Sequence, residues 1–221
     1  MPTSTIYAGS GDSRAQVSTS MSWTAARGSI LSSASIYSNT VTNDSFGVYN
    51  IFTGGRGGST YYCRRSYFPF DLSGESGTIE SAQINIYLDN LGTVGSNNDD
   101  VTLVEATALA GTSADYGNCF SSGTTLGTEI TSPVTVSTSA GYHAFTINSD
   151  GISTIQDSIG SGTFTVCLMG DLYDHTPSQP SLNSSYTKIH VYFSEDTSGS
   201  KDPYLSVTYK TENSNFLGTN F

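Results

Sequence analysis

Residues 79–88 constrain the fold of this chain more than any other part of its sequence. Within residues 82–88 every second side chain is apolar, and the residues between them are Gln83, Asn85 and Tyr87. Successive side chains of a β-strand point to opposite faces, so this period of two predicts a strand with one buried and one solvated face. Such a strand has to bury its apolar face against a second layer. The stretch therefore predicts part of a β-sandwich.

A second strand is predicted just before this one. Ser66–Phe70 is aromatic and extended, and Pro69 cannot donate a backbone hydrogen bond to a neighbouring strand. We therefore expect an edge strand or a bulged strand here. Residues 71–77 are rich in Gly and Ser and favour a turn between the two strands.

Further alternating or apolar runs predict strands at fairly regular spacing along the chain. They cover residues 16–19, 35–38, 46–52, 101–105, 134–136, 143–147, 163–169, 187–193 and 203–209. One helix is predicted over 151–160 from the spacing of its isoleucines, with Asp150 as its cap and Gly160 as its end. Residues 22–28 either anchor Trp23 in the core or form one helical turn. The pattern predicts an all-β protein, a single jelly-roll or β-sandwich domain with one short helix.

The length of 221 residues suits a single sandwich of this kind. We expect residues 1–60 to form an N-terminal arm and first strands that pack on the sandwich, and residues 61–210 to form its core. Residues 211–221 show no alternation and are expected to leave the domain as a tail. Phe216, Leu217 and Phe221 of this tail are the predicted assembly anchors, bound either to a neighbouring subunit or to an edge of their own sandwich.

Composition and charge narrow the classes of function. The chain holds 37 Ser and 29 Thr but only 12 % charged residues, which is typical of extracellular or virion-exposed β-proteins. A net charge of −11 argues against nucleic-acid binding, which needs basic patches. No apolar run reaches the roughly 20 residues of a membrane span, so we expect no membrane insertion. The N-terminus lacks a signal-peptide pattern, which predicts folding in the cytoplasm, with Cys63, Cys119 and Cys167 as free thiols.

Several segments follow one another in an order that is found in a known family. They are Arg65–Asp71, Ile79–Ala82, Ala114–Asn118, Gly141–Asn148, Phe193–Glu195 and Asp202–Tyr209. Over about residues 60–209 the chain resembles the disaggregatase-related, carbohydrate-binding-like β-sandwich modules of the DNRLRE type. Residues 8–28 resemble the phage and environmental versions in particular. The resemblance implies a jelly-roll fold and a non-catalytic binding or structural role, as in microbial surface proteins, polysaccharide-active enzymes and tailed-phage structural proteins.

Candidate catalytic residues are few and do not form a pattern. Gly11-Asp12-Ser13 is similar to the nucleophile block of one esterase family, but Asp171 lies four residues before His175 instead of three. A triad is defined by geometry, and the sequence brings no base to Ser13. The three histidines are far apart in sequence, and nothing pairs two glutamates for glycoside cleavage. We therefore predict no catalytic residues and no enzyme.

Two kinds of binding site remain open. Asp99 and Asp100 in the loop 97–100 offer hard oxygen ligands for a structural calcium ion, although a solvated loop without a metal is the favoured interpretation. Otherwise no cofactor is expected. Tyrosines can stack on sugar rings or fill a half-buried sheet. The candidate ligand-binding tyrosines are Tyr61, Tyr62, Tyr87, Tyr173, Tyr186 and Tyr192.

These observations lead to one preferred function and one alternative. The sequence favours a non-enzymatic structural protein of a bacteriophage virion, as a capsid decoration or a tail or fibre appendage. Its expected partners are other capsid or tail subunits, further copies of itself as a homo-oligomer, and host-surface glycans. The alternative is a carbohydrate-binding module of a microbial surface protein or polysaccharide-active enzyme, located extracellularly or at the cell surface.

Overall fold

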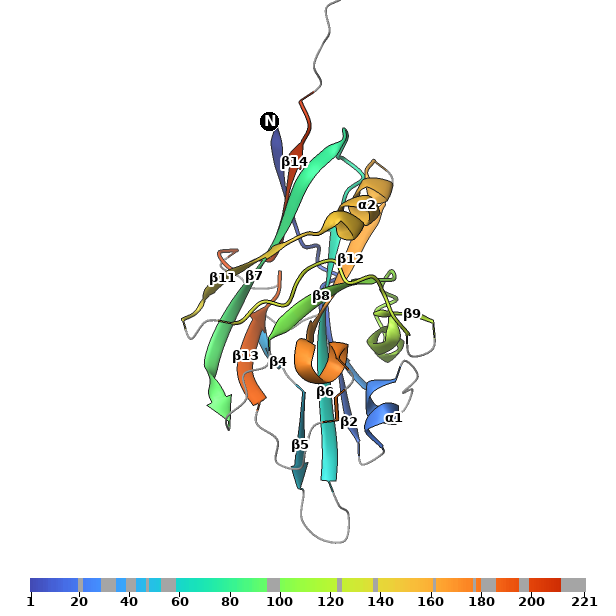
Figure 1. Ribbon diagram of the computed structural model, residues 1–221, viewed down its shortest axis with the longest axis vertical. Coiled ribbons are helices and arrows are strands. Elements are labelled where there is room, and N and C mark those ends of the chain that lie inside the picture. Colours follow the sequence, from blue (N-terminus) through green and yellow to red (C-terminus); the bar gives the residue numbers. More distant parts are fainter. Residues whose placement is uncertain are drawn as a thin grey trace, which may run out of the picture.

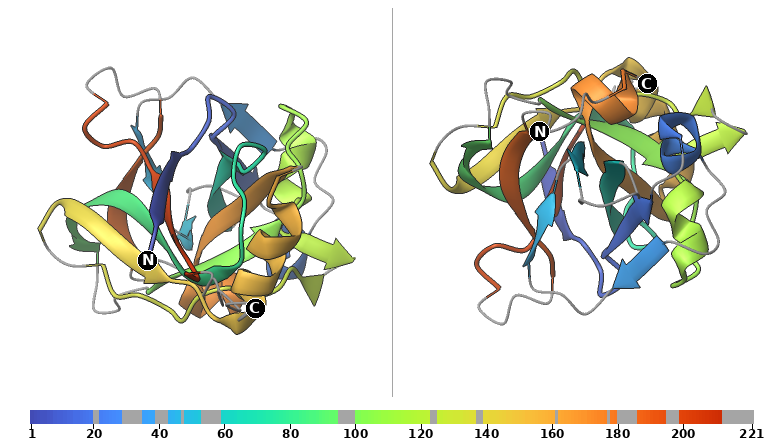
Figure 2. Two further views of the ribbon diagram at one scale, coloured as in Figure 1. Left: turned by 90° about the horizontal axis from the view of Figure 1, so that it is seen from above. Right: turned by 90° about the horizontal axis from the view of Figure 1, so that it is seen from below.

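The protein is an all-β sandwich of two antiparallel six-stranded sheets (Figures 1 and 2). The computed structural model describes residues 1–19, 22–28, 35–38, 43–46, 48–52, 59–94, 100–122, 125–136, 139–160, 162–176, 178–179, 186–194 and 199–211. Sheet A contains β1 (Thr3–Tyr7), β4 (Asn43–Phe46), β7 (Ile79–Val94), β11 (Gly141–Thr146), β13 (Tyr186–Tyr192) and β14 (Tyr204–Tyr209). Sheet B contains β2 (Ser13–Thr19), β3 (Ser35–Ser38), β5 (Val48–Phe52), β6 (Ser59–Asp71), β8 (Val101–Ala106) and β12 (Thr163–Gly170). The predicted fold class is confirmed.

Sheet A is organised around β7, the long strand predicted from the alternation in residues 79–88. β14 pairs with residues 79–85 of β7, β11 with residues 83–88, and β13 with residues 88–94. Figure 1 shows β14 beside the upper part of β7 and β13 beside its lower part. Ile84 and Ile86 are fully buried, whereas Tyr87 is only half-buried. The buried face of this strand is therefore confirmed, but the prediction that the other face is solvated holds only in part, because Tyr87 is half-buried and Asn85 is only 6 % exposed.

Sheet B is organised around β6 and is buried on both faces. Phe68 and Phe70 point into the core between the sheets, while Cys63, Arg65 and Tyr67 point to the opposite face and are also fully buried. β12 behaves in the same way, because its residues alternate between the two cores. Burial on both sides explains why residues 163–169 read as a nearly continuous apolar run.

The prediction of an edge or bulged strand around Pro69 is wrong, because β6 lies between β2 and β12. Pro69 is opposite Thr165 of β12, and its carbonyl oxygen accepts a hydrogen bond of 3.0 Å from the Gly9 N–H. The N and C=O of one strand residue point to the same side of the strand. The missing N–H of Pro69 therefore faces the turn before β2, beyond the last β2–β6 residue pair, Ser13 with Tyr67, and leaves the pairing with β12 intact.

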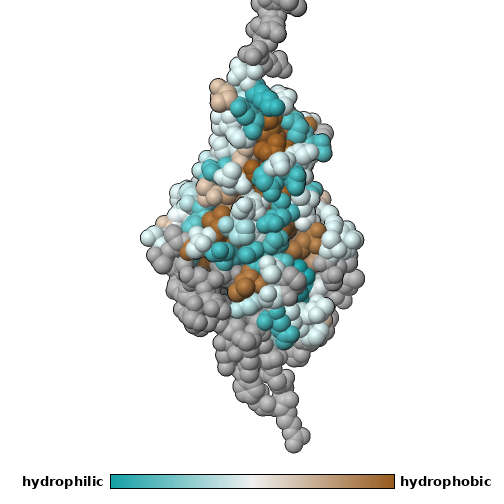
Figure 3. Space-filling model, viewed as in Figure 1, coloured by the Kyte–Doolittle hydropathy of each residue, from teal (hydrophilic) through white to brown (hydrophobic). Residues whose placement is uncertain are grey.

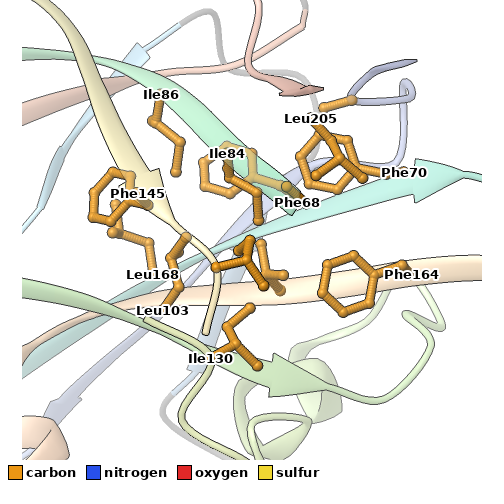
Figure 4. Packing of buried hydrophobic residues seen from close by; sticks show 14 of the residues in the cluster. Phe68, Phe70, Ile84, Ile86, Leu103, Ile130, Phe145, Phe164, Leu168 and Leu205 are labelled. Carbon is orange, nitrogen blue, oxygen red and sulfur yellow. The ribbon is translucent and has the colours of Figure 1, made fainter. Parts of the chain in front are cut away.

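The main hydrophobic core fills the space between the two sheets (Figure 4). Ile84, Ile86, Phe145 and Leu205 of sheet A meet Phe68, Phe70, Leu103, Phe164 and Leu168 of sheet B there. A second core lies on the other face of sheet B, under α1 (Trp23–Arg27), the 3₁₀-helix η2 (Ser113–Gly117) and the single π-helical turn η3 (Asp171–His175). A small hairpin of β9 (Phe120–Ser122) and β10 (Thr125–Leu126) follows η2.

The predicted helix is α2 (Ser149–Ser158), which packs Ile155 against the main core. Its cap is Asn148 and not Asp150, because the Asn148 carboxamide oxygen accepts from the N–H groups of residues 150 and 151. Gly151 allows the helix to approach the core closely. A Cβ at this position would lie 2.6 Å from Cγ2 of Ile147 and 2.8 Å from Cβ of Ile130.

The remaining local predictions have mixed outcomes. Residues 23–27 form a short helix capped by Ser22, and Trp23 at its start is also buried in the second core, so both interpretations of this stretch hold. Residues 46–52 do not form one strand, because β4 belongs to sheet A and β5 to sheet B. Val134 makes only an isolated bridge with Val101. The tail anchors Phe216, Leu217 and Phe221 lie outside the described residues, which end at Thr211.

The N-terminal residues contribute directly to both sheets. β1 pairs with β14 over its whole length, and β2 pairs with seven consecutive residues of β6. The boundary expected at residue 60 therefore does not separate an arm from the sandwich. In the view of Figure 3, hydrophobic groups on the surface of the described residues are scattered among hydrophilic ones.

Candidate functional site

The outer face of sheet A, which points away from the main core, carries a connected row of tyrosine side chains. We call this the tyrosine row. Its members are Tyr7 of β1, Tyr204 of β14, Tyr142 of β11, Tyr87 of β7 and Tyr192 of β13. Along the row the ring centroids are separated by 5.9, 5.3, 5.5 and 5.2 Å. Five strands therefore contribute one ring each to a single surface.

Strand register explains why these rings gather on one face. Tyr7 lies directly opposite Tyr204, and Tyr142 lies directly opposite Tyr87. Residues opposite each other in a sheet point to the same side, so each pair shares a face. Their chain neighbours, among them Ile86 and Leu205, point into the main core and are fully buried. The same alternation that builds the core thus places the tyrosines outside.

The row is accessible in part. The side chains of Tyr7 and Tyr142 are 57 % and 40 % exposed, and they rank among the most exposed large apolar or aromatic residues in the described chain. Tyr87, Tyr192 and Tyr204 are half-buried. Exposed aromatic rings with a polar hydroxyl are suited to binding, because one end makes apolar contacts and the other makes hydrogen bonds.

The loop that enters β14 covers one half of the row. The Tyr142 hydroxyl lies 3.2 and 3.0 Å from the carbonyl oxygens of Ser200 and Asp202 and shares its one proton between them. Lys201 lies between these two residues in the sequence, and its ammonium is 4.0 Å from the ring centroid of Tyr192 and 4.9 Å from that of Tyr87. These are cation–π distances. We call Tyr7, Tyr204 and Tyr142 the open half of the row, and Tyr87 and Tyr192 the covered half.

The outer face of sheet B also gathers polar and aromatic side chains, but here they are buried. Arg65 forms a bidentate ion pair with Asp174, with two nitrogen–oxygen distances of 2.7 Å. Two of its three remaining donors bond to the carbonyl oxygens of Tyr116 and Arg27, at 2.8 and 2.9 Å. Both members of the ion pair are fully buried. We call this group the buried arginine cluster.

The electrostatics of this cluster favour permanent charge on the arginine and a neutral Cys63 thiol beside it. Burial acts against the Arg65 cation, but Asp174 together with smaller contributions from Cys119, Tyr116 and Cys63 outweighs it and raises the pKa of Arg65 above its ordinary value. Burial, followed by the Asp174 carboxylate, raises the pKa of the Cys63 thiol. Cys63 donates to Asp174 at 3.4 Å, and Cys119 and Cys167 are also free and buried. The thiolate is the reactive form of cysteine, so this thiol is inert.

The buried arginine cluster is a structural element that fastens the covering segments to sheet B. Arg65 comes from β6, Asp174 from η3, Arg27 from α1 and Tyr116 from η2. The Tyr116 hydroxyl donates to the Ala26 carbonyl at 2.7 Å, which ties η2 to α1 as well. Because these groups satisfy one another away from solvent, the cluster offers no surface to a substrate.

The catalytic candidates do not assemble. Ser13 is buried, and among the described residues its hydroxyl has no hydrogen-bond partner. Asp12 accepts hydrogen bonds from the backbone N–H and the hydroxyl of Ser194, at 2.7 and 2.9 Å, and so anchors the end of β13. His175 contacts Asp171 at 3.0 Å through its Nδ1 atom, but no contact joins it to Ser13.

The predicted ligand-binding tyrosines have three different positions. Tyr87 and Tyr192 belong to the tyrosine row, while Tyr62 is half-buried on β6. The expectation that Tyr61 and Tyr173 are exposed is wrong: they are only 7 % and 6 % exposed and belong to the second core. Tyr61 packs on Trp23 and accepts a hydrogen bond of 2.6 Å from Gln179. The side chain of Tyr186 is outside the described part.

The sequence did not single out Tyr7, Tyr142 and Tyr204, although they make up the open half of the row. Tyr142 and Tyr204 belong to runs that alternate with buried residues, so their outward direction was readable. Their proximity could not be predicted from the sequence, because it depends on the register between β11, β7 and β14.

The candidate calcium loop is described only at its end. Asp99 is outside the described residues, and Asp100 is half-buried, with its carbonyl oxygen accepting a hydrogen bond of 2.8 Å from the Asp171 N–H. Within the described ranges, no group of three or more His, Cys, Asp or Glu side chains is arranged to hold a metal ion. The helices in these ranges are too short and polar to cross a membrane.

Comparison with known proteins adds no assignment. The chain matches no protein-family model, and no curated protein matches it significantly. The resemblance to the DNRLRE-type modules therefore stays a prediction from sequence.

Proposed function

We propose that the protein is a non-enzymatic structural protein of a bacteriophage particle whose tyrosine row contacts glycans on the host surface. The observation that carries the contact is the row itself, five connected rings on one outer face with Tyr7 and Tyr142 exposed. Aromatic rings present apolar faces to the C–H faces of sugars, and tyrosine hydroxyls can bond to sugar hydroxyls.

The virion setting rests on the sequence. Weakly charged strands rich in Ser, Thr and Tyr suit a protein exposed outside a cell, and the resemblance to tailed-phage structural modules points the same way. In this proposal the protein is a capsid decoration or a tail or fibre appendage. Its partners are capsid or tail subunits and further copies of itself, and the tail residues Phe216, Leu217 and Phe221 supply the anchor. It needs no cofactor; a structural calcium ion, if one is bound, would lie at Asp99 and Asp100.

The same surface also supports the alternative, a carbohydrate-binding module of a microbial surface protein or polysaccharide-active enzyme. The tyrosine row would serve both functions. The two differ in where the protein is found, so location discriminates between them and glycan binding does not.

The test is location and copy number in a purified particle. An antibody against the recombinant protein is used to label phage particles purified from the source of the sequence, and the copy number per particle is measured by quantitative mass spectrometry. We expect a fixed stoichiometry that follows the symmetry of the capsid or tail. Finding the protein only in the particle-free fraction, attached to cells or secreted, would replace the virion proposal with the alternative.

A further inference from the structure

The spacing and tilt of the tyrosine rings restrict the shape of glycan that the row can accept. Neighbouring centroids are 5.2–5.9 Å apart, close to the length of one pyranose unit along an extended chain. Successive rings are tilted by 54°, 66°, 83° and 81° to each other, so they share no plane. A flat crystalline polysaccharide surface can stack on only one or two such rings. A single chain that turns from one sugar to the next can meet them in succession.

The charge around the row restricts the chemistry of the chain. The protein carries a net charge of −11, which repels a polyanion at a distance. Lys201 adds one positive charge to the row, but the half-buried Asp202 follows it directly. Aromatic stacking needs no charge on the ligand. An uncharged glycan is therefore the class that this surface fits.

Lys201 divides the row into two halves that differ in access. Its ammonium rests against the rings of Tyr192 and Tyr87, where a stacked sugar would lie. The Tyr142 hydroxyl holds the backbone on both sides of Lys201, through the carbonyls of Ser200 and Asp202. A ligand reaching the covered half has to displace the lysine, whereas the open half needs no such movement.

Resting on the proposed function, we infer that the tyrosine row binds a single uncharged polysaccharide chain in solution. Tyr7, Tyr204 and Tyr142 form its open subsites, and Lys201 competes with the chain for Tyr87 and Tyr192. Removing the lysine side chain then extends the accessible site from three rings to five. It should strengthen binding of long chains by about two- to fivefold, the equivalent of one exposed cation–π contact.

The test is affinity electrophoresis of the full chain in native gels that contain one polysaccharide each. The panel holds soluble uncharged chains (mannan, galactomannan, dextran, xyloglucan and mixed-linkage β-glucan) and anionic chains (alginate and heparin), with sedimentation on crystalline cellulose as a separate arm. We expect retardation by at least one uncharged chain. Tyr7→Ala should weaken it, whereas Tyr7→Phe, which keeps the ring and leaves the bonds between Tyr142 and the loop before β14 in place, should retain most of it.

Two lysine variants test the cover. Lys201→Ala should increase retardation by the same chain, while Lys210→Ala, an equal charge change at the exposed end of β14, should leave it unchanged. Melting curves confirm that each variant is folded. Weaker binding by Lys201→Ala would mean that the lysine contacts the ligand and would overturn the inference. Binding confined to the anionic chains or to crystalline cellulose would also overturn the inference, although it would leave the glycan contact of the proposed function intact. No binding to any member of the panel would refute the glycan contact of the proposed function as well.

Discussion

The outer faces of both sheets carry aromatic side chains, but those of sheet A lie at the surface and those of sheet B are buried. On sheet A, the tyrosine row lies at the surface, with the Lys201 ammonium and the carbonyl oxygens of Ser200 and Asp202 against it. On sheet B, Tyr61, Tyr67 and Cys63 are covered by α1, η2 and η3 and buried to 7 % exposure or less. Aromatic side chains on an outward strand position therefore do not by themselves mark a binding surface. What decides is whether another segment of the chain covers them.

The covering of sheet B depends on polar groups that are satisfied internally. The Arg65 guanidinium donates hydrogen bonds to Asp174 and to two carbonyl oxygens of the covering segments. A buried charge is tolerated only when it is paired and hydrogen-bonded in this way. Sheet A has no comparable buried pair on its outer face within the described ranges. This contrast predicts that sheet B variants lose stability and sheet A surface variants lose binding.

The largest effect is expected from breaking the buried ion pair. Arg65→Met removes the bidentate partner of the buried Asp174 carboxylate, which keeps only the Arg27 Nε atom at 3.7 Å and the Cys63 thiol at 3.4 Å, and should lower the free energy of unfolding by about 3–5 kcal/mol. The matched control is Arg64→Met, since Arg64 is half-buried and bonds to the Gln16 side chain at 2.7 Å. Urea unfolding measures both variants. An Arg65→Met loss no larger than that of the control would show that the cluster does not hold the cover in place.

The next effect concerns the two faces of β7. Ile86→Ala removes a fully buried side chain from the main core and should cost about 2–5 kcal/mol through lost transfer energy and a cavity. Tyr87→Ala, one residue further along on the outer face, should cost clearly less because Tyr87 is only half-buried. Thermal melting compares the two variants. A reversed order would contradict the assignment of faces in sheet A.

Thiol reactivity tests how well sheet B is covered. Cys63, Cys119 and Cys167 are all fully buried in sheet B or under its cover. A thiol reagent added to the native protein should therefore react no faster than the chain unfolds, and all three thiols should react in urea. The reaction is followed by absorbance, with mass spectrometry to locate the label. Rapid native labelling of any of them would show that the cover opens.

The smallest effect is a pH dependence within sheet A. Burial lowers the pKa of His143 below its ordinary value of 6.5, and this residue of β11 lies opposite Ile86. The unfolded chain then takes up the proton at a higher pH than the folded chain does. The contribution of the neutral His143 side chain to stability is present above pH 6.5 and is lost as the pH falls through the lower pKa of the folded state.

The measurement is urea unfolding at pH 7.5 and pH 5. His143→Gln should lose less stability than the unmodified protein between these two values. If the stability of His143→Gln changed between the two pH values as much as that of the unmodified protein, burial of this imidazole would not explain the pH dependence.

The β-sandwich could be predicted from the sequence because the alternation of apolar and polar residues is a local pattern. Residues 82–88 show which side chains of β7 point inward, and the apolar run 163–169 shows a strand buried on both faces. The partners of a strand are not local. Pro69 suggested an edge, but the structure places its missing N–H beyond the end of the β2–β6 pairing, where no donor is needed.

The candidate site was accessible to sequence reasoning only in part, for the same reason. Tyr87 and Tyr192 were identified as candidates, and the structure places them in the row, but Tyr61 and Tyr173 were equally plausible until their covering segments were known. No strand or helix was predicted between residues 106 and 132. These residues include η2, whose Tyr116 is a principal member of the buried cover.

The most direct test of the contrast between the two outer faces is hydroxyl-radical footprinting of the tyrosines. It is carried out on the free protein and on the protein with a polysaccharide that retards it in the gel. We expect strong oxidation of Tyr7 and Tyr142 in the free protein and protection of both in the complex, with Tyr67 and Tyr116 unreactive in each state. Oxidation of Tyr67 or Tyr116 as strong as that of Tyr142, or no protection of Tyr142 by the bound chain, would contradict the account.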